Sequence, residues 1–295
     1  MITDQRWADL LRTRATDPGA VGRAYAARTR RNLFAGKETL FLVAADHPAR
    51  GALGVGADPL AMADRRGLLE RLLVALANPE VDGVLGTPDV IEELLLLDGL
   101  HNRVVIGSMN RGGLAGACWE IDDRFTGYDA QSIVDYGLDG GKMLLRLVDD
   151  DPGTIPTLES CANAVSQLAG HGLMAMVEPL PYQRLDGKLV LQEDTAALSR
   201  AVTIAAGLGV TSAHTWLKLP APADPAVLDA TTLPILLLGG VPSGNPDTDL
   251  ETWGPPLRHP AVRGLVVGRT LLYPPDGDVA TAVAKAAQLL KEIPA

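Results

Sequence analysis

Residues 195–219 read TAALSRAVTIAAGLGVTSAHTWLKL. The first part, over 195–209, has the apolar spacing of a helix and ends in Gly-Leu-Gly, which is typical of a helix C-terminus. The last part, over 214–219, is a short apolar run that predicts a buried strand. The stretch therefore predicts a helix that leads into a strand, which is the repeating unit of an α/β fold.

The same unit recurs along the rest of the chain. Short runs rich in Val, Ile and Leu alternate with helical patterns from residue 40 onward, including helices over 59–77 and, at the end of the chain, 278–293. The predicted strands cover 40–46, 81–87, 103–109, 140–148, 173–179, 214–219, 234–240 and 263–268. The pattern therefore contains eight strands in strict alternation with helical segments.

This alternation favours a (β/α)8 barrel over an open doubly wound sheet. The open sheet would be expected to carry G-x-G-x-x-G at its first turn, and GALGVG over 51–56 has its glycines at other spacings. We therefore predict an α/β protein with a single-domain (β/α)8 TIM barrel over 40–295. Residues 1–39 are predicted to form an N-terminal extension with one extra helix that packs on the barrel.

Composition limits the partners. Lys and Arg number 26 against 36 Asp and Glu, which gives a net charge of −10 without a clustered basic face, so nucleic acid is not expected as a partner. Two cysteines are too few for a disulfide framework or a thiolate metal site. Neither a signal peptide nor an apolar run of about 18 residues is evident. We therefore expect a cytoplasmic protein with no membrane partner.

Ionisable residues stand within or at the ends of several predicted strands, and the active sites of such barrels lie at the C-terminal ends of the strands. They are Asp46, Lys142, Arg146, Glu178 and Lys218. Because buried charges need partners, we expect these side chains to meet. Desolvation and a neighbouring cation lower the pKa of a lysine, and the free amine can attack a ketone to form a Schiff base. A glutamate would then shuttle protons, and an aspartate would handle the proton of the substrate hydroxyl.

Each of these residues also has a structural interpretation. Lys218 could end its strand in solvent, Glu178 could order a loop, Lys142 could pair with an acidic neighbour, and Asp46 could cap a turn. We weigh catalysis above these alternatives. Arg146 shares the face of Lys142 one layer nearer the C-terminal rim, which makes it a candidate ligand for a phosphate or carboxylate.

The last two predicted strands end in residues suited to an anion. Gly239 and Gly240 end one strand, and Gly268 and Arg269 stand at the end of the other. Glycines let an anion approach the backbone N–H groups, and barrels often bind phosphate at this position. The glycines could instead serve tight turns alone, but with Arg269 beside them we predict a phosphate site.

The histidines do not predict a metal site. His47 and His214 have no second histidine or carboxylate at a recognisable ligand spacing. We therefore expect both to be structural, and we predict neither a metal nor a cofactor.

The ordered set of strand-end motifs resembles the class I, Schiff-base aldolases of the DhnA and tagatose-bisphosphate aldolase group. The motifs are DHPARGALG, VDGVLGTPDVI, LKLPAP, LLLGGVPSG and VVGRTLLYP. The resemblance implies a Schiff base on Lys218, catalytic roles for Lys142, Glu178 and Asp46, and phosphate binding by the glycines and Arg269. The chain departs from the group at Trp216 and in Leu-Pro-Ala after Lys218, and the segment 107–130 has no counterpart that we can map.

The function implied is a metal-independent lyase that cleaves or forms a carbon–carbon bond in a phosphorylated keto-sugar or keto-acid. The chain is also similar to aldolase-like proteins of actinobacterial inositol-catabolism clusters, which makes 6-phospho-5-dehydro-2-deoxygluconate a candidate substrate. Two alternatives stay open: a sugar-phosphate isomerase or epimerase that works through Glu178 and Asp46, and a non-catalytic protein that binds sugar phosphates. We also expect a homo-oligomer, whose subunit number the sequence does not give.

Overall fold

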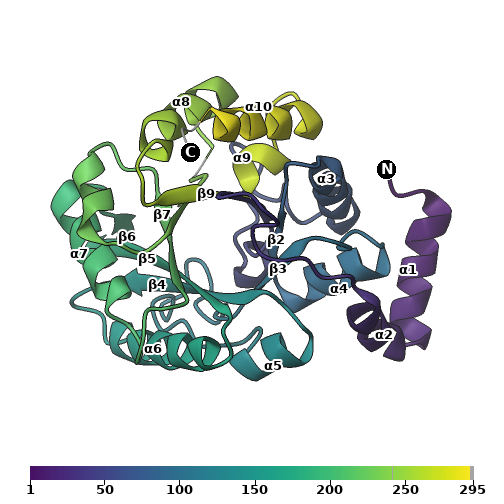
Figure 1. Cartoon of the computed structure of the whole chain (residues 1–295), viewed down its shortest axis with the longest axis horizontal. Coiled ribbons are helices and arrows are strands. Elements are labelled where there is room, and N and C mark those ends of the chain that lie inside the picture. Colours follow the sequence, from purple (N-terminus) through teal and green to yellow (C-terminus); the bar gives the residue numbers. More distant parts are fainter. Residues whose placement is uncertain (241, 293–295) are drawn as a thin grey trace.

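The protein is a closed (β/α)8 barrel, seen in a computed structural model that describes residues 1–240 and 242–292 (Figure 1). Eight parallel strands pair in the order β4-β3-β2-β1-β9-β8-β7-β5, and a β4–β5 pairing closes the ring. The strands are β1 Leu40–Ala44, β2 Gly83–Gly86, β3 Val104–Ser108, β4 Gly140–Leu147, β5 Met174–Leu185, β6 Lys188–Leu191, β7 Thr215–Pro220, β8 Ile235–Leu238 and β9 Val262–Val267. The predicted barrel is confirmed.

Alternate residues of each strand point into the barrel and fill it in layers. The interior apolar cluster consists of Leu40, Leu42, Ala44, Leu85, Val104, Ile106, Met174, Met176, Trp216, Leu236 and Val266. The next inward positions toward the C-terminal end are polar: Asp46 continues the face of β1, Glu178 that of β5 and Lys218 that of β7. The apolar layers thus form a floor on which the charged residues stand.

Helices surround the strands and cover the outer core (Figure 1). They are α1 Asp4–Thr16, α2 Gly19–Ala27, α3 Arg65–Ala77, α4 Pro88–Leu96, α5 Ala130–Asp135, α6 Thr154–Gly170, α7 Thr195–Ala206, α8 Pro246–Leu257, α9 Arg269–Leu272 and α10 Val279–Lys291, with short 3-10 helices over Pro48–Arg50 and Pro225–Ala230. The predicted start of α3 at residue 59 was wrong, because Asp64 caps the helix by accepting from the Gly67 amide. Residue 293, the last of the predicted closing helix, lies outside the described residues.

An antiparallel hairpin of β5 and β6 is an addition to the predicted pattern. Strand β5 continues past Glu178 to Leu185, and β6 pairs back onto its last four residues. Asp186 and Gly187 connect them with φ of 48° and 77°, which fits the Asp-Gly turn typical of two-residue hairpins. The hairpin stands on the C-terminal side of the barrel, beside the site described below.

The N-terminal extension holds two helices, α1 and α2, and not the single helix predicted. The chain after them brings Leu33 and Phe34 against the interior apolar cluster. The rings of Phe34 and Trp216 lie 5.6 Å apart between centroids. Trp216 therefore belongs to the apolar floor of the barrel, one layer below Lys218, and does not line the cavity above it.

Within the described residues, every helix is too short or too polar to cross a bilayer.

Gly264 on β9 gives a test of the barrel packing. Its φ is +130°, and a Cβ at this position would lie 1.9 Å from the carbonyl oxygen of Leu40 on β1. We expect Gly264→Ala to destabilise the protein by at least about 3 kcal/mol, because backbone strain and a clash with a paired strand add together. Urea unfolding measures the loss. Gly254→Ala is the control, since its Cβ would meet nothing nearer than 3.9 Å; an equal effect of both changes would contradict the strain argument.

Candidate active site

A cavity of about 440 Å³ opens at the C-terminal end of the barrel. Asp46, Lys142, Glu178 and Lys218 all line it, as do Gly239, Gly240, Gly268 and Arg269. The structure thus brings together residues from six strands and the loops after them. The most distant in sequence, Asp46 and Arg269, are 223 positions apart. Of the predicted site residues, Arg146 alone does not line this cavity among the described residues.

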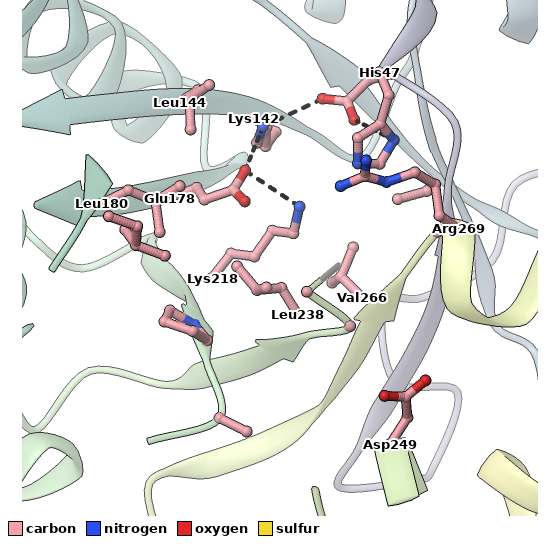
Figure 2. A pocket seen from close by; sticks show the side chains of 18 of the residues that line it. His47, Lys142, Leu144, Glu178, Leu180, Lys218, Leu238, Asp249, Val266 and Arg269 are labelled. Atoms are coloured by element: carbon pink, nitrogen blue, oxygen red, sulfur yellow. Dashed lines mark hydrogen bonds and ion pairs between the residues drawn. The ribbon is translucent and has the colours of Figure 1, made fainter. Parts of the chain in front are cut away.

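Glu178 lies between two lysines (Figure 2). Its Oε2 is 2.5 Å from Lys142 Nζ and 3.2 Å from Lys218 Nζ. The register explains the arrangement: Glu178 pairs with Leu144, so Lys142 starts one layer deeper on β4 and its long side chain reaches up to the carboxylate. Lys218 is 4% exposed and Lys142 is 1% exposed, so both ammonium groups depend on this carboxylate.

Asp46 holds the other side of Lys142. Its Oδ2 is 3.2 Å from Lys142 Nζ and 3.1 Å from Arg111 Nη1, and it accepts a hydrogen bond of 3.0 Å from Ser108 Oγ. Asp46 is 1% exposed. The chain Arg111, Asp46, Lys142, Glu178, Lys218 therefore alternates in charge across the floor of the cavity.

This alternation of positive and negative side chains shifts the pKa values of Glu178, Asp46 and Lys142. Burial alone would raise the pKa of Glu178, but Lys142 and then Lys218 outweigh it and lower that pKa to about 2. The pKa of Asp46 is likewise held well below its ordinary value by Lys142 and Arg111, against the effect of burial. Burial lowers the pKa of Lys142 to about 8, although Asp46 and Glu178 favour its charged form. Lys142 can therefore exchange a proton near neutral pH.

The wall formed after β8 and β9 is suited to an anion. Neither the Gly239 nor the Gly240 amide donates a hydrogen bond to another described residue. Gly240 has a φ of +69° and open space where a Cβ would stand. The Arg269 guanidinium, whose pKa burial lowers, lies on this side of the cavity and reaches the Gly54 carbonyl at 3.4 Å.

His47 lies beside Arg269 (Figure 2). Burial lowers the pKa of His47 to about 3, with help from the charges of Arg269 and Lys218. Its imidazole is therefore neutral at ordinary pH and can offer the cavity a hydrogen bond without a charge. No three side chains of His, Cys, Asp or Glu lie in positions to hold a metal ion in the part of the chain that the structure describes.

Arg146 does not line the cavity. Its guanidinium donates to Glu120 Oε1 at 2.5 Å, to Asp123 Oδ2 at 3.2 Å and to the carbonyl oxygens of Gly113 and Glu120. With 1% exposure it is enclosed by the segment 107–130, which folds over the end of β4. The alternation of β4 gave Arg146 and Lys142 a common face, but it could not show that this loop covers the Arg146 side chain.

The cavity residues that were missed from the sequence include Arg50, Arg111 and Tyr182. Arg111 stands three residues after β3, so the strand-end rule that selected Asp46 could have selected it too. Arg50 comes from the loop after β1. Tyr182 lies on the extension of β5, and only recognition of the hairpin would have placed it.

The chain has relatives of known structure. The family model described as Cgl0159-like matches residues 38–287. The crystal structure of Cgl0159 from Corynebacterium glutamicum is 49% identical, with 98% of each chain covered and a TM-score of 0.96. No curated protein matches the chain.

Aldolases share the fold at low identity. An archaeal fructose 1,6-bisphosphate aldolase is 18% identical, covers 92% of this chain and 98% of its own, and has a TM-score of 0.67. A Schiff-base-forming fructose-1,6-bisphosphate aldolase is also 18% identical, with 92% and 99% covered and a TM-score of 0.63. These likenesses establish an aldolase-type barrel and no more than the fold.

Proposed function

The chain belongs to the Cgl0159-like family, and from the cavity of its barrel we propose that it is a class I aldolase. The observation that carries the proposal is a buried lysine, Lys218, whose Nζ lies 3.2 Å from the Glu178 carboxylate on a cavity floor. An amine so placed can attack a carbonyl while a carboxylate within reach moves protons. The reaction is the cleavage or formation of a carbon–carbon bond.

The first half of the reaction forms the imine. Lys218 attacks the carbonyl carbon as a free amine, and its nitrogen then loses a proton. Glu178 carries protons to the former carbonyl oxygen, which leaves as water. The resulting protonated imine can accept the electron pair of the bond between the α and β carbons, because that pair becomes the double bond of an enamine while the C=N electrons move onto the nitrogen.

The second half needs a base for the substrate hydroxyl. As that hydroxyl becomes a carbonyl, its proton must be taken up while the carbon–carbon bond breaks. The geometry favours Lys142 in its neutral form over Asp46 for this step, since Asp46 Oδ2 already interacts with Lys142, Arg111 and Ser108. In this proposal Asp46 acts by holding Lys142. The enamine left on Lys218 is then protonated, and water hydrolyses the imine to release the second product.

The substrate class follows from the wall beside this floor. Gly239, Gly240, Gly268 and Arg269 line one side of the cavity and suit a phosphate group. A phosphorylated keto-sugar or keto-acid would place its phosphate there and its carbonyl at Lys218. The resemblance noted in the sequence adds 6-phospho-5-dehydro-2-deoxygluconate to the candidates.

A cleavage assay tests the function. The protein is incubated with ketose phosphates and with 6-phospho-5-dehydro-2-deoxygluconate in the presence of EDTA, and products are followed by NMR. We expect two fragments from at least one compound. An isomer without fragments would instead support the isomerase or epimerase alternative, and unchanged compounds that nevertheless bind would support a non-catalytic protein.

A further inference from the structure

Arg111 reaches Asp46 from the loop after β3. It stands three residues after that strand, and its Nη1 lies 3.1 Å from Asp46 Oδ2. The same Nη1 donates to the Asp46 carbonyl oxygen at 3.4 Å. Among the described residues, Asp46 is the one acidic side chain that forms an ion pair with Arg111. Because Arg111 is only 4% exposed, its charge depends on this carboxylate.

The backbone that carries Arg111 is held against β4. The Asn110 side chain donates to the Leu144 carbonyl oxygen at 2.6 Å and accepts from the Leu144 amide at 2.7 Å. Asn110 is fully buried, and its carbonyl oxygen accepts from Arg111 Nε at 2.5 Å. Leu144 stands two residues after Lys142 on the same strand. These hydrogen bonds therefore fix the Arg111 guanidinium relative to Lys142.

Arg111 changes the charge balance of the cavity floor. Without it, the floor holds two lysines, Lys142 and Lys218. Two carboxylates, those of Asp46 and Glu178, balance them. Arg111 adds a third cation, and a guanidinium does not lose its proton in a protein. The buried cluster therefore has one positive charge in excess until one lysine gives up a proton, and like charges nearby disfavour a charged lysine.

Lys142 is the lysine that shares a partner atom with Arg111. Both cations contact Asp46 Oδ2, which lies 3.2 Å from Lys142 Nζ. Burial is the largest influence on the pKa of Lys142 and lowers it; Asp46 after β1 and Glu178 on β5 raise this pKa, whereas Arg111 and Lys218 on β7 lower it. Arg111 thus offsets part of the stabilisation that Asp46 gives to charged Lys142.

We propose that Arg111 is a positioning residue for proton transfer: it holds the Asp46 carboxylate in place and, by its charge, keeps Lys142 available as an uncharged base. This deepens the proposed function, on which it rests for the role of Lys142. Arg111 exchanges no proton itself. The segment 107–130, for which the sequence resemblance gave no counterpart, thereby supplies a part of the catalytic site.

The pH dependence of kcat for cleavage tests the proposal. In the wild type, kcat should rise with pH around the pKa of Lys142, about 8. Arg111→Gln removes a charge that disfavours protonated Lys142, so the rise should move by about one pH unit or more to higher pH. At pH 7, kcat should fall by about tenfold and recover as the pH is raised. Arg111→Lys keeps a cation beside Asp46 and should restore the wild-type position of the rise.

NMR of protein labelled with 13C-lysine gives a second readout that does not require turnover. The Cε resonance of Lys142, assigned by its absence in Lys142→Met, reports the pKa of this lysine directly. We expect a higher pKa of Lys142 in Arg111→Gln than in the wild type or in Arg111→Lys. A merely structural role would lower kcat at every pH without moving either midpoint. If Arg111→Gln does not fold, Arg111→Met, which also removes the charge, gives the same test.

Arg124→Gln is the matched control. Arg124 lies in the same segment, is exposed, pairs with Asp122 and does not line the cavity, so its replacement should leave both midpoints unchanged. Midpoints that stay in place or move to lower pH in Arg111→Gln would overturn the proposal, as would an Arg111→Lys protein that behaves like Arg111→Gln. The proposed function fails separately, if borohydride traps no ketone on Lys218 of the wild type.

Discussion

Replacing Lys218 with alanine is expected to lower kcat/KM for carbon–carbon cleavage by about 10⁴-fold or more. The reason is that the variant has no amine at the end of β7 with which to form the imine, so the electron pair of the breaking bond has no acceptor. The fold should persist, because Glu178 keeps its 2.5 Å contact with Lys142. Cleavage kinetics and far-ultraviolet circular dichroism measure the two effects.

A matched lysine variant controls for the Lys218 result. Lys188 lies on β6, is exposed and does not line the cavity, so Lys188→Ala should retain full activity. If Lys218→Ala cleaved the substrate at the wild-type rate, the Schiff-base mechanism would be excluded. If Lys218→Ala instead converted the substrate to an isomer at the wild-type rate, without cleavage, the isomerase interpretation would be favoured.

Replacing Glu178 with glutamine should affect both activity and stability. The change leaves Lys142 and Lys218 buried without the carboxylate that lies between them. Breaking a buried ion pair by removal of one partner costs about 3–5 kcal/mol of unfolding free energy. Loss of a positioned proton carrier should also lower kcat by about 10²- to 10⁴-fold. Urea unfolding and steady-state kinetics measure these effects, with Glu251→Gln on an exposed face of α8 as the neutral control.

The stability effect of Glu178 should depend on pH. The pKa of Glu178 is about 2 in the folded protein and about 4.5 in the unfolded chain, so the unfolded state binds the proton first as the pH falls. Its stabilisation, about 3 kcal/mol from these values, is therefore complete above pH 4.5 and lost as the pH falls toward 2. In Glu178→Gln this contribution to the acid-induced loss should be absent. An identical pH dependence in both proteins would contradict the assigned charge state.

Much of the fold could be predicted because the strands repeat one simple pattern. Apolar runs followed by Gly, Pro or Asp located the eight barrel strands. Charged residues within or at the end of these strands included the four that meet on the cavity floor. Side-chain alternation also gave Lys142 and Arg146 a common face, and in the structure both side chains are buried. The sequence did not show whether Trp216, which shares the face of Lys218, lines the cavity or packs in the apolar layer below it. That depth depends on how neighbouring strands are shifted relative to one another along the barrel axis.

The rest of the site depends on contacts between distant loops. The segment 107–130 has no periodicity, so nothing in the sequence indicates that Glu120 binds Arg146 and Arg50 at once. The hairpin carried one recognisable signal, Asp186-Gly187, but the placement of Tyr182 depends on how β5 continues beyond Glu178. Strand ends can be read from a sequence, whereas the loops that complete a cavity follow from tertiary packing.

Peptide mapping after borohydride reduction tests the central claim most directly. The protein is reduced in the presence of a ketone that it cleaves, and the modified peptide is identified by mass spectrometry. We predict a single substrate-dependent adduct on Lys218, with none on Lys142, which has 1% exposure and lies against two carboxylates. An adduct on Lys142, or active cleavage without an adduct on any lysine, would contradict the account.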